Sequence, residues 1–425
     1  MIAATAVKAT GARHKVIAFA VTLAVLSYID RVCISQAAPI ISKEFGLDRG
    51  QMGEVFSAFA LAYALFEIPG GWMGDKMGPR VVLMRIVIWW SFFTAATGFM
   101  WNLTSLKIAR FLFGAGEAGC FPNLTKSFTT WLPVGERVRA QGIMWMSARW
   151  GGAFTPILVV AIFRIVDWRT AFMIFGLLGT VWAAAFYYWY RDNPKDHPSV
   201  NAAELAIIGG AAGSASGHGD VPWKKLVTSR SVLLLWLQYF LLSYSWYFYI
   251  TWLPTYLQDK KHLSAEYSAV LGILPLFLGG IGCMVSGLIA PVITRLTGDM
   301  RKTRRILSCI GFAGAAILVF SFMQIEDPLL GMICIGMSSF FNDIVMPPAW
   351  GACMDIGGKY AGTLSGSMNM VGNLAGAVAP MFGGYVLKAT GDNWTIFFYT
   401  MVASYVLGLL LWPMIDPVTP LEDAK

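Results

Sequence analysis

Apolar stretches recur along the whole chain, separated by short polar segments. Each has about the 20 residues that an α-helix needs to cross a hydrocarbon core of about 30 Å. The first stretch is followed by eleven more, so we interpret it as a membrane span and not as a cleaved signal peptide. The pattern predicts an all-α membrane protein with twelve spans, at residues 16–42, 51–73, 81–101, 104–127, 138–163, 169–190, 231–257, 266–292, 305–325, 328–353, 360–387 and 394–414.

One long connection divides these spans into two groups of six. It covers residues 191–230, and its stretch 209–219 (GGAAGSASGHG) has the composition of a flexible linker. Weak matches spaced 224 to 226 residues apart relate the two groups: 152–156 with 376–380, 168–172 with 394–397, and Arg80 with Arg305. We therefore expect two six-helix pseudo-repeats, residues 1–190 and 231–425, with a cytoplasmic linker at 191–230. Such repeats are typical of transporters whose site lies near the midplane between the halves.

The charge distribution agrees with a membrane protein. Charged residues make up 13% of the chain, against about 25% in a soluble protein. With the N-terminus inside, 20 of the 32 Lys and Arg residues lie on the cytoplasmic side, 8 on the opposite side and 4 within spans. This bias predicts that both termini are cytoplasmic and explains the net charge of +8 without nucleic acid. Short loops and a compact chain favour a bacterial inner membrane.

Several kinds of chemistry are not indicated. The six cysteines show no CxxC spacing, and no nucleophile or metal cluster is visible, so we expect no metal, no cofactor and no enzyme activity. The sequence GAGEAG at 114–119 formally matches a dinucleotide fingerprint, but it lies inside an apolar helix. We interpret it as small residues that allow close helix approach. The four histidines fall in predicted loops, so carboxylates must carry any transported proton.

Ionisable residues within predicted spans are costly in lipid and therefore indicate function. Asp30 and Arg31 lie in the first span, and Arg110 and Glu117 lie in the fourth. Seven residues make about two helical turns, so Arg110 and Glu117 share one face. An arginine in such a cavity suits a carboxylate ligand, and Asp30 or Glu117 can pair with it when the site is empty. A purely structural ion-pair network between the two helices is the alternative.

Residues 71–80, between the second and third spans, read GWMGDKMGPR. This segment resembles the signature loop of the major facilitator superfamily, G-x-x-x-D-[RK]-x-G-R-[RK], with Pro79 in place of one arginine. Gly78 permits a short turn, and Asp75 near a helix end can pair with basic groups and latch the two halves. We therefore expect Asp75 and Arg80 to act in gating, within a major facilitator fold.

Three further motifs give a narrower resemblance, to the anion:cation symporter family. That family includes bacterial proton-coupled carriers of galactonate, glucarate and hexuronates, and animal vesicular glutamate and lysosomal sialate carriers. The resemblance spans essentially the whole chain but specifies no substrate. It is carried by Tyr28-Ile-Asp30-Arg31, by Arg110 and Glu117 followed by Phe121-Pro122, and by a segment running from Asp355 to Asn369 and Asn373.

The resemblance implies a role for each matching residue. Arg31 would hold the substrate carboxylate, and Tyr28 and Tyr63 would contribute hydroxyl groups. The proton sites would be Asp30 and Glu117, with Arg110 as their tuning partner.

Arg149 departs from the pattern, because sugar-acid carriers can place a glutamine there. It indicates a second anionic group on the substrate, an acid partner, or an arginine that snorkels towards the membrane surface. The spans of the second half carry no Lys or Arg beyond Arg305 at the edge of one span. We therefore expect that half to contribute neutral groups to substrate binding: Gln238, Asn369 and Asn373.

The sequence thus predicts a proton-coupled symporter that imports an organic anion by alternating access. A sugar acid with a single carboxylate, of the hexonate or hexuronate type, is the expected substrate. Alternatives are a carrier of an aromatic or amino-dicarboxylic acid, an anion exchanger, or a non-transporting sensor. An organophosphate exchanger would be expected to present basic residues from both halves. The expected partners are the substrate, protons and the lipid bilayer, without nucleic acid, and we expect a monomer.

Overall fold

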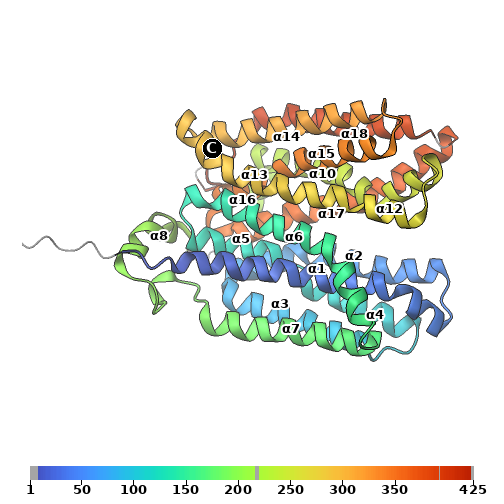
Figure 1. Cartoon of the computed structure of the whole chain (residues 1–425). Coiled ribbons are helices and arrows are strands. Elements are labelled where there is room, and N and C mark those ends of the chain that lie inside the picture. Colours follow the sequence, from blue (N-terminus) through green and yellow to red (C-terminus); the bar gives the residue numbers. More distant parts are fainter. Residues whose placement is uncertain (1–7, 216–219, 392, 423–425) are drawn as a thin grey trace, which may run out of the picture.

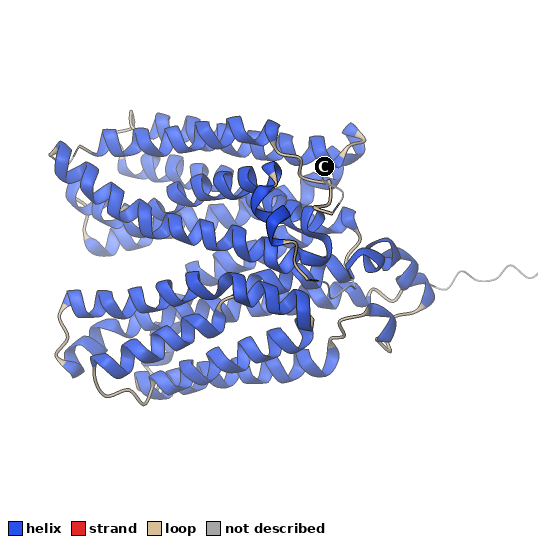
Figure 2. Cartoon of the chain, turned by 180° about the vertical axis from the view of Figure 1, so that it is seen from behind, coloured by secondary structure: helices blue, strands red, loops and turns tan. Residues whose placement is uncertain are grey.

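The computed structural model describes residues 8–215, 220–391 and 393–422, and these form a helical protein (Figures 1 and 2). Helices α1 to α7 form one bundle, drawn from blue to green in Figure 1, and α10 to α18 form a second bundle beside it. The first comprises α1 (Ala12–Phe45), α2 (Arg49–Met77), α3 (Pro79–Thr97), α4 (Leu103–Glu117), α5 (Cys120–Trp131), α6 (Val134–Phe163) and α7 (Trp168–Trp189). The second comprises α10 (Arg230–Thr251), α11 (Leu253–Thr255), α12 (Ala265–Leu271), α13 (Ile273–Thr297), α14 (Met300–Phe322), α15 (Pro328–Ile344), α16 (Met346–Gly357), α17 (Ala361–Thr390) and α18 (Trp394–Leu411).

The twelve predicted spans are confirmed as helical segments of this fold. Nine continuous helical stretches within the described residues are long and apolar enough to cross a membrane, and one of them, Pro328–Leu387, contains the tenth and eleventh spans together. The fourth span is absent from the nine because it is split into α4 and α5. The seventh, α10, is absent too, and it is rich in Trp, Tyr and Ser. The chain is therefore a multi-pass integral membrane protein.

Two of the spans are broken at equivalent places in the two halves. The fourth breaks at Ala118-Gly119, between α4 and α5, and the tenth breaks at Val345, between α15 and α16. Pro122 and Pro347 lie just after these breaks, 225 residues apart. Proline lacks an amide hydrogen, so it fits best in the first turn of a helix, where that hydrogen has no partner, and each helix restarts close to its proline. The spacing matches the repeat seen in the sequence.

Arg80 and Arg305 are related by the same spacing. Each guanidinium donates two hydrogen bonds to one backbone carbonyl near the end of its own bundle, of Tyr187 and of Ile415 respectively. Arg80 therefore ties the signature loop to α7, and it forms no hydrogen bond or ion pair with the described residues of the second half.

The connection between the bundles is more ordered than its composition suggested. Helix α8 (Ala202–Ala215) includes the first part of the stretch expected to be flexible, and residues 216–219 lie outside the described residues. A short α9 (Trp223–Thr228) follows. Helix α8 lies at the end of the molecule where α1 begins and the chain ends (Figure 1), which we call the terminal end. There the Glu204 carboxylate accepts hydrogen bonds from the backbone N–H groups of Gly11 and Arg13.

The two bundles meet most closely towards the terminal end. Helices α2 and α17 cross at Gly71 and Gly362, where a Cβ added to Gly71 would lie 2.2 Å from the Gly362 carbonyl oxygen. Only glycine permits so close an approach of two backbones. The described residues show no hydrogen bond or ion pair between the bundles beyond the level of Trp150, whose indole donates to the Phe277 carbonyl. The halves are thus joined from the terminal end to mid-height.

The small residues at 114–119 serve close packing, as expected. A Cβ on Gly114 would lie 2.5 Å from the Phe59 carbonyl oxygen, and one on Gly119 would lie 2.6 Å from the Gly70 Cα. Both contacts are with α2. This segment ends α4 and starts α5, and no strand precedes it, which excludes the dinucleotide interpretation.

Candidate functional site

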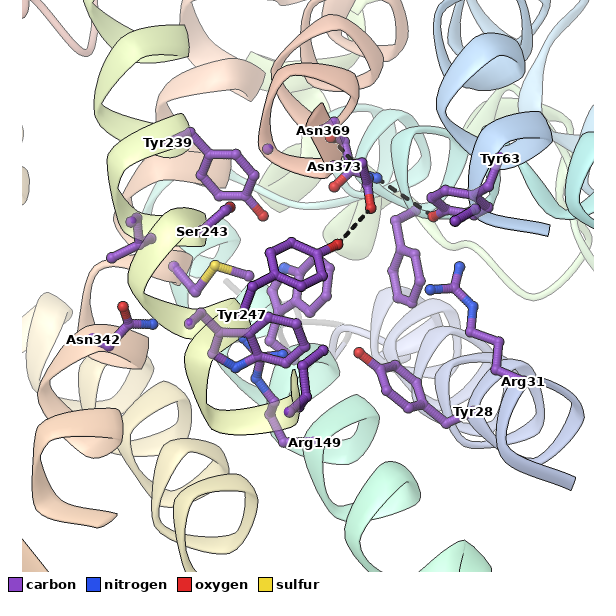
Figure 3. A pocket seen from close by; sticks show the side chains of 18 of the residues that line it. Tyr28, Arg31, Tyr63, Arg149, Tyr239, Ser243, Tyr247, Asn342, Asn369 and Asn373 are labelled. Carbon is purple, nitrogen blue, oxygen red and sulfur yellow. Dashed lines mark hydrogen bonds between the residues drawn. The ribbon is translucent and has the colours of Figure 1, made fainter. Parts of the chain in front are cut away.

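A cavity of about 310 Å³ lies between the two bundles near mid-height (Figure 3). Its walls come from α1, α2, α5 and α6 on one side and from α10, α15, α16 and α17 on the other. Aromatic side chains make up much of the lining. Six of the residues proposed from the sequence to bind substrate line it: Tyr28, Arg31, Tyr63, Arg149, Asn369 and Asn373.

Arg31 is held in a fixed plane at the cavity wall. Its Nε donates to Glu117 Oε1 at 2.8 Å, and its guanidinium carbon lies 4.3 Å from the centre of the Tyr63 ring. Ser27 donates a second hydrogen bond to the same carboxylate oxygen, at 2.5 Å. The Nη2 group of Arg31 has no hydrogen-bond partner in the described chain. The arginine is therefore oriented by Glu117 and Tyr63, with donor capacity left over for a ligand.

Asp30 and Arg110 lie behind this wall and do not line the cavity. Both are buried. Neither carboxylate oxygen of Asp30 has a hydrogen bond of ordinary distance and angle among the described residues, and the nearby Trp90 indole N–H makes at most a weak one to it. The Arg110 guanidinium stacks on Phe113, at 4.4 Å from the ring centre. None of the described ion pairs includes Arg110. Glu117, which lies on the same helix as Arg110, pairs with Arg31 of α1.

A chain of hydrogen bonds crosses the cavity wall from the first half to the second. The Asn369 amide donates to Glu67 Oε1 at 2.8 Å and to the Tyr63 hydroxyl at 3.4 Å. Asn373 donates to the Asn369 carbonyl and accepts from the Tyr247 hydroxyl at 3.1 Å (Figure 3). Asn369 and Asn373 thus present neutral polar groups to the cavity from α17, as the sequence suggested.

Arg149 has an acid partner in the opposite half. Its Nε and Nη2 donate to the two carboxylate oxygens of Asp343, at 2.6 and 3.0 Å, and its guanidinium stacks on the Trp246 ring at 4.2 Å. Asn342 donates a further hydrogen bond to Asp343, at 2.9 Å. Sequence reasoning assigned no role to Asp343, although it is the acid deepest within the spans of the second half.

Gln238 is not brought to the cavity. Its amide donates to the Leu235 carbonyl on its own helix, and its oxygen accepts from the Trp412 indole at 3.2 Å. The side chain is fully buried where α10 packs against Trp412, near the C-terminal end of α18 (Trp394–Leu411). The additional amide at the cavity comes from Asn342 on α15.

Asp75 of the signature loop joins the two halves at the terminal end. Its carboxylate accepts hydrogen bonds from the backbone N–H groups of Gly362 and Thr363, at 3.0 and 2.6 Å, and from the Thr363 hydroxyl at 2.7 Å. These groups form the first turn of α17, where a negative charge is favourable. Lys126 lies 3.5 Å from the same carboxylate. Arg80 has no part in this contact.

A second ionic contact lies beside the first. The Asp355 carboxylate accepts hydrogen bonds from Arg137 of the first bundle and Arg304 of the second. All three side chains are buried. No group of three or more His, Cys, Asp and Glu residues that could hold a metal ion occurs in the described part of the chain.

Comparison with known proteins identifies the family. The profile described as "Major Facilitator Superfamily" matches residues 20–380. A "Probable sulfoacetate transporter" of Cupriavidus necator is 36% identical over 420 residues, covering 97% of this chain and 96% of that protein. A "Probable galactarate/D-glucarate transporter" of Escherichia coli is 30% identical, covering 98% and 96%, and a "Hexuronate transporter" of Bacillus subtilis is 27% identical, covering 88% of each. The chain therefore belongs to the major facilitator superfamily, and it is a membrane transporter and not an enzyme.

Proposed function

We propose that this protein is a proton-coupled symporter of small organic anions of the sugar-acid type. The observation that carries the proposal is the pairing of Arg31 with Glu117 at the wall of a cavity between two helical bundles. A substrate carboxylate that binds the free N–H groups of Arg31 shares the positive charge that stabilises the ionised Glu117 carboxylate. Substrate binding therefore weakens the Arg31–Glu117 pair, which links substrate binding to the charge on Glu117.

Proton uptake compensates the weakened ion pair. Glu117 is fully buried, and a buried carboxylate whose cation is shared with a second anion is costly unless a proton neutralises it. Asp30 offers a second proton site close to Arg110, as the family resemblance implies. Substrate and proton then promote each other's binding, because linkage between two sites is reciprocal.

Neutral groups complete substrate recognition. Asn369, Asn373, Tyr28 and Tyr247 line the cavity, and their amides and hydroxyls suit the hydroxyl groups of a sugar acid. The named cargoes of the three relatives, sulfoacetate, galactarate or D-glucarate, and hexuronate, are all organic acids. This agreement supports an anionic cargo.

Transport proceeds by rocking of the two bundles, 1–190 and 231–425, about the cavity. The Lys and Arg bias supports a cytoplasmic terminal end, and with that orientation in a bacterial inner membrane this structure is an outward-facing state. Entry to the cytoplasm requires separation of Gly71 from Gly362 and release of Asp75 from α17. Since the cavity is enclosed by the two halves of one chain, a monomer is sufficient.

Uptake into proteoliposomes tests this function. We expect accumulation of a labelled sugar acid when an inward proton gradient is imposed, and its loss when a protonophore is added. Replacing external sodium with potassium should leave uptake unchanged. Accumulation that requires sodium and ignores the pH gradient would contradict the proposal.

A further inference from the structure

We propose that the cavity holds a second anion subsite at Arg149, so that the preferred cargo is a small organic acid with two acidic groups. This inference rests on the proposed function and narrows its substrate class. The starting observation is the charge of the wall. Two arginines, Arg31 and Arg149, are among the described residues that line the cavity, and that lining includes no Asp or Glu.

The two arginines have the same kind of surroundings. Each donates from Nε to a buried carboxylate that lies outside the lining, Glu117 for Arg31 and Asp343 for Arg149. Each guanidinium also stacks on one aromatic ring of the cavity wall, at 4.3 Å for Arg31 and 4.2 Å for Arg149. A carboxylate on one edge and a ring on one face fix the plane of the group.

Each arginine keeps donors for a ligand. Arg149 uses Nε and Nη2 for Asp343, and its Nη1 has no acceptor among the described residues. Arg31 uses Nε for Glu117, and its Nη2 is without a partner in the described chain. A planar guanidinium with free N–H groups binds a carboxylate or sulfonate through charge-assisted hydrogen bonds. Arg149 therefore has the features that make Arg31 an anion site: a guanidinium fixed by a carboxylate and an aromatic ring, with N–H groups left free.

A single small molecule can reach both groups. Arg31, Arg149, Tyr28 and Tyr247 line the same cavity of about 310 Å³. Figure 3 shows the four side chains around it. A cargo with an acidic group at each end would engage both arginines and place its middle against the tyrosine hydroxyls. The sequence alone favoured a single carboxylate, and the second guanidinium changes that expectation.

A purely structural interpretation makes a different prediction. If the Arg149–Asp343 pair only fastens the two halves, its removal changes the affinities for all acids to the same extent. If Arg149 binds the second acidic group, its removal weakens diacids alone. The ratio of the diacid affinity to the monoacid affinity therefore distinguishes an Arg149 that binds the ligand from an Arg149 that only fastens the two halves.

The test compares acids that differ only in one terminal group. D-glucarate against D-gluconate is a long pair, and sulfoacetate against glycolate is a short pair that carries a sulfonate. Binding is measured by calorimetry on the purified full-length protein, together with counterflow in proteoliposomes. The variant is Arg149→Gln with Asp343→Asn, which removes both charges of the pair and leaves no unpaired ion. The matched control is Arg169→Gln with Glu44→Gln, an arginine–carboxylate pair (2.6 Å) stacked on Trp168 and outside the cavity lining.

We expect the native protein to bind the diacid of at least one pair about 10- to 100-fold more tightly than its partner, the ratio given by one charge-assisted contact. In the Arg149 variant this ratio should fall to about one while monoacid binding is retained, which also shows that the variant is folded. A native ratio near one, or a ratio that survives in the variant, would overturn the second subsite and leave the symporter proposal standing. Absence of counterflow for every acid would overturn both.

Discussion

Replacing Arg31 with lysine keeps the positive charge and removes the planar fork, so it isolates the contribution of geometry to substrate binding. The guanidinium contacts Glu117 through Nε, its buried Nη2 has no partner among the described residues, and the Tyr63 ring lies 4.3 Å from the guanidinium carbon. An ammonium cannot form two parallel bonds to one carboxylate. Loss of one charge-assisted hydrogen bond costs about 1.5–3 kcal/mol, and loss of the stacking about 1 kcal/mol more.

Together these losses of about 2.5–4 kcal/mol raise Kd by about 70- to 900-fold at 25 °C. Calorimetric titration of a bound sugar acid into the purified Arg31→Lys protein measures this change directly. Arg169→Lys is the matched control, because Arg169 also pairs with a glutamate and stacks on an aromatic ring but lies outside the cavity lining. Affinity in the Arg31 variant within a factor of three of the native value would refute the reasoning and make Arg31 a structural clamp.

Three further changes address coupling, gating and the terminal end. Glu117→Gln imitates the protonated acid, so counterflow should persist in proteoliposomes while accumulation driven by a pH gradient is lost; normal accumulation would remove Glu117 from the coupling mechanism. Asp75→Asn removes the charge that caps α17, so the backbone amides of Gly362 and Thr363 should exchange their hydrogens with solvent faster than in the native protein; an unchanged rate would show that Asp75 does not hold this end closed. Burial acts to raise the pKa of Glu204, but hydrogen bonds from Arg13 and from the Gly11 backbone outweigh it and lower the pKa below its ordinary value of 4.5. The contact therefore stabilises the protein at neutral pH and is lost as the pH falls below 4.5. The protection factors of residues 8–16, which compare each exchange rate with that of an unstructured chain at the same pH, would detect this loss; equal protection at pH 7 and pH 3.5 would contradict it.

The spans were predictable because their sequence is set by lipid and by neighbouring helices along their whole length. The breaks within them were not. Hydrophobicity continues through Ala118-Gly119 and through Val345, so the pattern records the environment of each residue and not the backbone angles. The stretch 209–215 illustrates the opposite error, because a composition rich in glycine and alanine was taken for a flexible linker and lies in helix α8.

The cavity residues were predictable where an ionisable or amide side chain stands out in an apolar span, as with Arg31 and Asn369. Their pairing was not, because it depends on how each helix is rotated and on which neighbour it meets. Seven residues separate Arg110 from Glu117, which is about 10 Å along a helix axis and longer than an ion pair. Gln238 shows the same limit, since its side chain points away from the cavity towards Trp412.

The contact of Gly71 with Gly362 provides a means of holding the transporter in one conformation. A methyl group on Gly71 would lie 2.2 Å from a carbonyl oxygen, about 1 Å inside the ordinary C···O separation of about 3.3 Å. Alanine at this position therefore forces α2 and α17 apart. Nearby hydrogen bonds, such as the one that the Thr363 N–H donates to Asp75, cannot lengthen by that amount without breaking. One added carbon atom would bias the population towards the form open at the terminal end, which gives crystallographers and makers of conformation-specific antibodies a stable preparation of the opposite state.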